Sequence, residues 1–249
     1  MANFDQNRMQ TGVGARDSAI DQGLRSYMLS VYNYMAGGLA ITGVVAYLAF
    51  SMAVTNTGAG LELTSTGAAL YTSPLKWVVM LAPLGLVFFL SARIASMSVS
   101  AAQISFWVFA GLMGLSLSSV FLIYTGNSIT QTFFVTAAAF GGLSLYGYTT
   151  KRDLTAMGSF LIMGVIGILI ASVVNIFLAS SALQFAVSVL GVLIFAGLTA
   201  YDTQRIKSMY FEGDALATAS KKAIMGALSL YLDFINMFMF LLQFLGNRR

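Results

Sequence analysis

SLYLDFINMFMFLLQFLG, residues 229–246, is an apolar run that carries one carboxylate, Asp233. Together with the residues before it, this run is long enough for a membrane-spanning helix, which needs about 20 mostly apolar residues. The nearest basic residues in sequence are Lys222 and Arg248, too far along the helix to pair with Asp233. An ionised aspartate at the centre of a membrane helix costs about 2.5–3.5 kcal/mol, a cost that a structural role rarely requires. The stretch therefore predicts a membrane helix with a functional acid.

The rest of the chain is also apolar: of 249 residues, 58% are hydrophobic and 9% charged, against roughly 25% charged in a soluble domain. Apolar runs of membrane-spanning length recur along the sequence, and no long polar domain separates them. We predict an all-α integral membrane protein, a seven-transmembrane-helix bundle (residues 28–249) that follows an N-terminal cytoplasmic tail (residues 1–27). The expected spans are 28–52, 75–94, 101–124, 130–150, 155–178, 182–204 and 223–245.

Basic residues gather on one side of these spans, which predicts the orientation of the protein. The positive-inside rule places the N-terminus and the basic loops in the cytoplasm and, with seven crossings, the C-terminus outside. Arg248 and Arg249 slightly oppose an outside location of the C-terminus, because a basic tail prefers the cytoplasm. The alternative is a last segment that enters the membrane and returns to the cytoplasmic side. Scattered charges of this kind do not predict a nucleic-acid partner. The predicted inner side holds Arg8, Arg16, Arg25, Arg93, Lys151, Arg152, Arg205, Lys207, Lys221 and Lys222, and the outer side Lys76, Arg248 and Arg249.

The chain contains neither cysteine nor histidine. These absences exclude thiolate chemistry, Ser–His and Cys–His catalytic pairs and histidine zinc motifs. We therefore expect no enzymatic activity and no resident cofactor. Any pH sensing must use carboxylates or amines.

Polar residues on the last span recur at helical spacing. Gly226, Ser229, Asp233 and Asn236 are separated by three or four positions, and Gln243 follows seven residues later. A stripe of this kind cannot face lipid, so we expect the last helix to lie inside the bundle or to line a pore. The alternative for the uncharged members is hydrogen bonding between helices, worth about 0.6 kcal/mol per bond.

A second acid lies in GLTAYDTQRI, residues 197–206, near the cytoplasmic end of the sixth expected span. Asp202 can meet Asp233 in space, and two carboxyl groups in a low dielectric share a proton and can titrate near neutral pH without histidine. The simpler interpretation is an ion pair between Asp202 and Arg205, three residues on. Arg93, at the end of the second span, is either an interfacial anchor or a latch that holds the aspartate pair.

Several segments together resemble a known family. GLTAYDTQRI and ALSLYLDFINMFMFLLQFLG, with VYNYMAGGLAITGVVAY in the first span and YTTKRDLTAMGSFLIMGVIGILIASVVNIFL across the fourth and fifth, are similar to the transmembrane Bax inhibitor motif (Bax inhibitor-1-like) family, in particular its bacterial members. The likeness extends from about residue 25 through nearly the whole chain. It implies a seven-helix bundle with the last helix central.

The resemblance also implies a function: a pH-sensitive calcium leak gated by a hydrogen-bonded aspartate pair. Asp202 and Asp233 match that pair and would be the groups that contact the permeating calcium ion, and Arg93 resembles the family's latch. The implied location is a bacterial inner membrane. Some bacterial members are thought to modulate a membrane-bound quality-control protease, so that protease is an implied partner besides the lipid bilayer.

Two other function classes remain open. A non-conducting regulator of a membrane partner would use the polar stripe only for structure. An intramembrane aspartyl protease would use two aspartates on consecutive helices to hold a water, but the YLDF segment lacks glycines that would admit a substrate backbone. We therefore favour the calcium leak.

Overall fold

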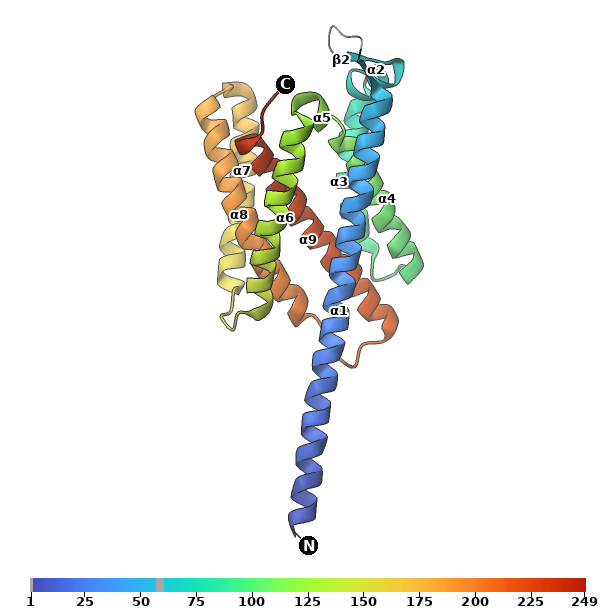
Figure 1. Cartoon of the computed structure of the whole chain (residues 1–249), viewed down its shortest axis with the longest axis vertical. Coiled ribbons are helices and arrows are strands. Elements are labelled where there is room, and N and C mark those ends of the chain that lie inside the picture. The colour runs from blue at the N-terminus through green and yellow to red at the C-terminus, as the bar shows by residue number, and fades with distance from the viewer. Residues whose placement is uncertain (1, 57–60) are drawn as a thin grey trace.

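The computed structural model describes residues 2–56 and 61–249, with side chains from residue 21 onward. Nearly all of this is helical (Figure 1), and the small hairpin of β1 and β2 is antiparallel, with Val54 opposite Leu63. The elements in chain order are α1 (Ala2–Ala53), β1 (Val54–Asn56), β2 (Leu61–Leu63), α2 (Ser65–Tyr71), α3 (Leu75–Arg93), α4 (Val99–Leu117), α5 (Val120–Ile123), α6 (Gly126–Thr149), α7 (Thr155–Leu178), α8 (Ser181–Ser208) and α9 (Leu216–Leu245).

In the described part of the chain, seven helical segments are long and apolar enough to cross a membrane. Each corresponds to one of the seven spans expected from the sequence, so the prediction of an all-α seven-helix membrane bundle is confirmed. The third span combines α4 and α5. The segments are Asp21–Ala53, Leu75–Arg93, Val99–Ile123, Gly126–Thr149, Thr155–Leu178, Ser181–Ser208 and Leu216–Leu245.

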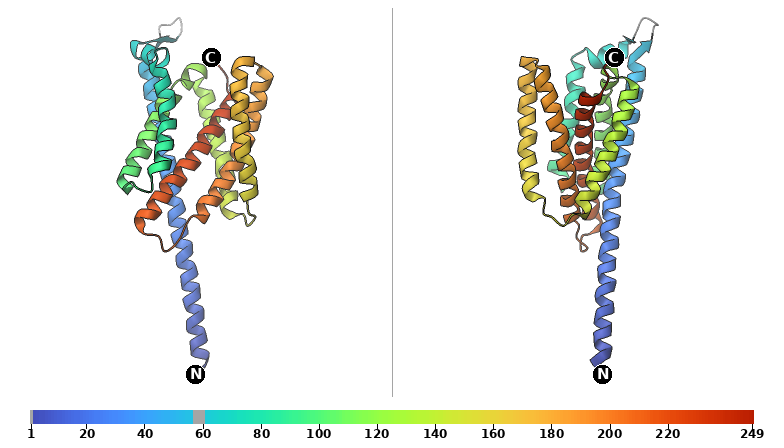
Figure 2. Two further views of the ribbon diagram at one scale, coloured as in Figure 1. Left: turned by 180° about the vertical axis from the view of Figure 1, so that it is seen from behind. Right: turned by 60° about the vertical axis from the view of Figure 1, so that its left-hand side comes forward.

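Helix α9 is the centre of the bundle. It crosses the molecule obliquely, between α6 and α8 on one side and α1 and α4 on the other (Figures 1 and 2). In its most apolar window 67% of residues are buried, against 11–33% for the other spans. The predicted central position of the last helix is confirmed.

Tyr231 shows how α9 is packed. Its ring lies edge-on to Phe109 of α4, with centroids 5.1 Å apart. Its hydroxyl is 2.7 Å from Oγ1 of Thr42 on α1, and Thr42 in turn donates to the carbonyl of Ala110 at 2.9 Å. A buried tyrosine hydroxyl normally requires a hydrogen-bond partner. Here that partner connects three helices through one fully buried side chain.

The connection between the last two spans is shorter than expected. We expected residues 205–222 to join them, but α8 continues to Ser208 and α9 begins at Leu216. The charged residues excluded from the expected spans are good helix formers and extend both helices. Lys222 also stabilises the turn, since its Nζ lies 2.6 Å from Oδ2 of Asp214 and 3.0 Å from the carbonyl of Met209.

The two ends of the chain lie at opposite ends of the bundle (Figure 1). Residues after α9 pair with the junction of α5 and α6: Thr125 N donates to the carbonyl of Asn247 at 3.1 Å, and Arg249 N to that of Ile123 at 2.9 Å. Helix α9 thus runs the full length of the bundle rather than entering and returning. At the other end α1 has no break at residue 28. The cytoplasmic location of residues 1–27 stays a prediction, and the side chains of residues 1–20 lie outside those described.

The crossing of α6 and α8 yields a test of the packing. A Cβ added to Gly147 would lie 2.2 Å from the backbone oxygen of Ala200, whereas one added to Gly142 would meet nothing within 4 Å. We expect Gly147→Ala to lower the midpoint of thermal unfolding in detergent, with an overpacking cost of roughly 1–3 kcal/mol. Gly142→Ala is the matched control and should leave the midpoint unchanged or higher, because alanine favours helix. Equal midpoints for the two variants would contradict this crossing.

Candidate functional site

The structure places the two predicted aspartates on neighbouring helices. Asp202 lies on α8 and Asp233 on α9, and these helices pack against each other. Both residues are buried, with exposed fractions of 8% and 5%. No hydrogen bond joins their carboxyl groups in the described part of the chain. The two acids thus lie on facing helices, and their hydrogen-bonded pairing stays a prediction.

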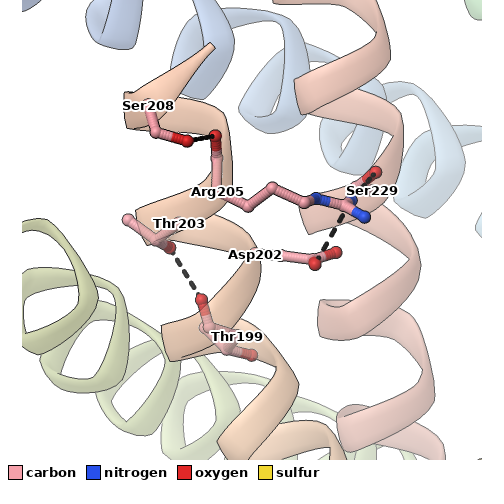
Figure 3. A network of polar contacts seen from close by, with 6 residues as sticks. All are labelled: Thr199, Asp202, Thr203, Arg205, Ser208 and Ser229. Carbon is pink, nitrogen blue, oxygen red and sulfur yellow. Dashed lines mark hydrogen bonds and ion pairs between the residues drawn. The ribbon is translucent and has the colours of Figure 1, made fainter. Parts of the chain in front are cut away.

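Arg205 joins the two helices at this point (Figure 3). Its Nη2 lies 3.2 Å from Oδ1 of Asp202 and donates to Oγ of Ser229 on α9 at 3.3 Å. Its guanidinium also lies 5.7 Å from the ring centroid of Tyr201. The side chain of Arg205 is 44% exposed, and such pairs contribute only about 0.3–0.5 kcal/mol to stability. The contact therefore does more to orient Asp202 than to hold the fold together.

Asp233 lies one helical turn beyond Ser229 and is less well satisfied. Its Oδ2 is buried and has no hydrogen-bond partner among the described residues. Leaving a buried polar atom unpaired costs about 1–3 kcal/mol, and more when it is charged. A proton, a water molecule or a cation can satisfy this atom. Because this acceptor is unpaired, a species bound there would change the stability of the helix bundle.

Next to Asp202, a chain of hydroxyl groups runs from α8 to α1. Thr203 is fully buried and donates to the carbonyl of Thr199 at 2.7 Å. Its Oγ1 is 3.0 Å from Oγ of Ser144 on α6, which is 2.6 Å from the hydroxyl of Tyr32 on α1. Three helices are connected in this way to the turn that carries Asp202.

The remaining residues of the YDTQ segment connect α8 to its other neighbours. The ring of Tyr201 fills the space beside Gly158 of α7, where an added Cβ would lie 2.5 Å from ring atoms. Gln204 accepts a hydrogen bond from Leu154 N at 2.9 Å and donates to the carbonyl of Arg152 at 2.7 Å. The side chains flanking Asp202 thus hold α8 against α6, α7 and the connection between them.

Comparison with known proteins identifies the family to which the chain belongs. A family model described as "Inhibitor of apoptosis-promoting Bax1" matches residues 24–249. The chain belongs to this family, the Bax inhibitor-1 family. The matched region contains the first span from Leu24 onward, the other six spans in full and both aspartates, so the resemblance seen in the sequence is confirmed.

Several bacterial members of the Bax inhibitor-1 family are similar over nearly their whole length. An uncharacterized protein of Caulobacter vibrioides is 50% identical over 234 residues, which cover 94% of this chain and 93% of that protein. An uncharacterized protein of Rickettsia prowazekii is 48% identical over 235 residues (94% and 95%). The inner membrane protein YbhL of Escherichia coli (strain K12) is 47% identical over 229 residues (91% and 94%).

In the described part of the chain, the other residues predicted for the site of this Bax inhibitor-1 family protein form no hydrogen bond or ion pair with either aspartate. Arg93 is exposed at the end of α3 and forms no ion pair with any described residue, so its latch role stays a prediction. Asn236 is half-buried and donates to the carbonyl of Leu232 on its own helix at 2.8 Å. Gln243 is exposed and accepts a hydrogen bond from Ser188 of α8 at 3.2 Å. Within the predicted polar stripe, Ser229 is the member that contacts the charged group of α8.

The predicted calcium contacts consist of two carboxylates. No group of three acidic, histidine or cysteine side chains gathers in the described part of the chain. Calcium takes six to eight oxygen ligands in proteins, so a passing ion at Asp202 and Asp233 would keep water or backbone oxygens in most of its coordination shell. The contact of calcium with Asp202 and Asp233 stays a prediction.

Sequence reasoning missed the residues that support the aspartates. Thr203, Ser144 and Tyr32 are uncharged residues within helices, and the sequence carries no signal of their contacts across helices. The spacing of Asp202 and Arg205 did predict their pairing, but the reach of Arg205 to Ser229 depends on how α8 and α9 cross.

The hydroxyl chain yields a second test. We expect Ser144→Ala and Thr203→Val to be coupled in a double-mutant cycle of unfolding in detergent, because each removes one side of the 3.0 Å contact. Hydrogen bonds between membrane helices average about 0.6 kcal/mol, which sets the expected coupling. The matched control pairs Thr203→Val with Ser172→Ala, since Ser172 donates to the carbonyl of Ile168 on its own helix. Additive effects in the first cycle would show that the two hydroxyls do not interact.

Proposed function

We propose that this protein is a passive, pH-sensitive calcium leak of a bacterial inner membrane, gated by the network of Asp202, Asp233 and Arg205. The observation that carries the proposal is the buried Oδ2 of Asp233, which has no hydrogen-bond partner among the described residues. Asp233 lies on α9, the most buried span, and Asp202 lies on the neighbouring helix α8. A passing cation or a proton competes for the same oxygens. Occupancy of the pair would then alter the contact between α8 and α9.

The charge balance of this network supports the proposal. The network contains two carboxyl groups and one guanidinium, so its fully ionised form has an excess negative charge that attracts a cation. Hard carboxylate oxygens suit calcium. The bilayer is the surrounding medium, and the inner-membrane location rests on the similarity to YbhL.

The decisive measurement is calcium entry into liposomes that contain the purified protein, while pH is stepped through the neutral range. We expect Asp233→Asn and Asp202→Asn each to change the dependence of flux on pH, because each removes one titrating partner of the pair. Identical flux-versus-pH curves for wild type and both variants would remove the aspartates from the gate.

Asp153→Asn is the matched control for this measurement. Asp153 is exposed on the connection between α6 and α7, and hydrogen bonds from the hydroxyl and backbone N–H of Thr155 lower the pKa of Asp153 below its ordinary value. Because its pKa is lowered, Asp153 is ionised throughout the neutral range and titrates only in acid. The control should keep the wild-type pH profile.

Two arginine variants test the latch. We propose Arg93 as the latch predicted from the family, and Arg205 as the group that holds Asp202 in place. Arg205→Gln should raise the basal leak at neutral pH about twofold, in line with the small energy of a half-exposed pair. Arg93→Ala should also raise it, whereas Lys151→Ala, an exposed basic residue in a loop, should not. An unchanged leak in Arg93→Ala would restrict the latch to Arg205.

A second candidate is a non-conducting regulator of a membrane partner, such as a quality-control protease. It is favoured by the structural contacts of Tyr201, Thr203 and Gln204, which leave Asp202 as part of a helix junction. Wild-type liposomes without calcium flux at any pH, with the protein folded, would select this candidate. We propose no hydrolytic role, because the YLDF segment that carries Asp233 lacks the glycines that would admit a substrate backbone.

A further inference from the structure

A groove runs along the outside of the bundle between α1 and α6, which lie side by side in Figures 1 and 2. Its volume is about 470 Å³, and the described residues that line it belong to these two helices. The helices are antiparallel, so Arg25 of α1 and Tyr148 of α6 lie at the same end of it. The α1–α6 groove extends roughly 12 Å along the helices, given about 1.5 Å per residue.

The wall of the groove is mostly apolar and open to the outside. Leu29 and Leu145 line it with exposed fractions of 50% and 63%. An added Cβ at Gly141 would meet no atom within 4 Å. Because this surface belongs to membrane-spanning segments, its surroundings are the acyl chains of lipids.

One end of the groove is positively charged. Arg25 is exposed and forms no ion pair with any described side chain. Lys207 of α8 donates to the carbonyl of Tyr148 at 2.8 Å, and its Nζ lies 4.9 Å from the Tyr148 ring centroid. Lys207 likewise has no acidic partner in the described part of the chain. Arg25 thus lines one end of the groove and Lys207 lies against Tyr148 at the same end, both without an ion-pair partner among the described side chains. Basic pockets between membrane helices are suited to anionic lipid headgroups.

We propose that the α1–α6 groove binds one anionic phospholipid, with its headgroup phosphate at Arg25 and Lys207 and an acyl chain along the groove. The guanidinium of Arg25 can bind phosphate oxygens through two hydrogen bonds. The lipid comes from the leaflet at the Arg25 end, which is the cytoplasmic leaflet in the predicted orientation.

This site contacts the aspartate network through its wall. Tyr32 and Ser144 both line the groove, and their hydroxyls form the chain that reaches Thr203, next to Asp202. A lipid in the groove therefore packs against the outer members of that chain. The binding itself does not depend on ion conduction, because bound lipid is measured directly.

The test uses the full chain, stripped of lipid in detergent and given equal amounts of phosphatidylglycerol and phosphatidylcholine with the same acyl chains. Native mass spectrometry counts the lipids retained. We expect wild type to retain one phosphatidylglycerol in preference to phosphatidylcholine, and Arg25→Gln to lose roughly fivefold of that preference, as expected for one basic residue. Lys76→Gln is the charge control, on the opposite side in the predicted topology, and should keep it.

A second pair of variants tests the apolar part. Gly141→Leu should fill the groove and lower retention of both lipids, whereas Gly142→Leu, equally free of clashes but outside the groove, should bind as wild type does. Circular dichroism checks that each variant is folded, and if Gly141→Leu is not, the Arg25→Gln comparison decides alone. Equal retention of the two lipids by wild type would overturn the proposal. So would a lipid-free dimer that Gly141→Leu converts to monomer, which would assign the groove to a second copy.

Discussion

The burial of Asp233 on the central helix is the constraint on which the arrangement of this bundle depends. Lipid offers no hydrogen bonds, so partners for a carboxyl group at such a position can come only from neighbouring helices, water or a bound species. Helix α8 brings Asp202 and Arg205 to the interface with α9, where Oδ2 of Asp233 has no hydrogen-bond partner among the described residues. Helix α8 is held in register by hydroxyl contacts to α6 and α1 and by Gln204 at the connection to α7. The ion pair of Asp202 and Arg205 and the hydrogen bonds of the neighbouring Thr203 and Gln204 thus lie on the same turns of α8.

The sequence predicted the spans well because each is a long apolar run, and it predicted the central place of α9 because a polar stripe cannot face lipid. It failed where hydropathy and helicity differ. Lys221 and Lys222 interrupt the apolar run but not the helix, so α9 begins at Leu216. The hairpin of β1 and β2 is only a few residues long, and segments of that length carry no periodic signal.

The two aspartates could be found from the sequence because an acid in an apolar run is conspicuous. Their neighbours could not. Thr203 and Ser144 look like ordinary polar residues of a helix, and their contact depends on the crossing of α6 and α8, where Gly147 brings the backbones together. Arg205 and Arg93 end spans in the same way, and only the three-dimensional arrangement shows that Arg205 is the one beside Asp202.

The position of α9 has a consequence for how the protein is made. Chains fold as they are synthesised, N-terminal parts first, yet the helix that fills the middle of this bundle comes after the other six spans in the sequence. Until α9 enters the membrane, the faces of α1, α4, α6 and α8 that it covers lack their partner. Assembly therefore ends with the insertion of the core. A nascent chain halted before α9 would hold six spans around an unfilled centre, exposed to lipid, chaperones and proteases.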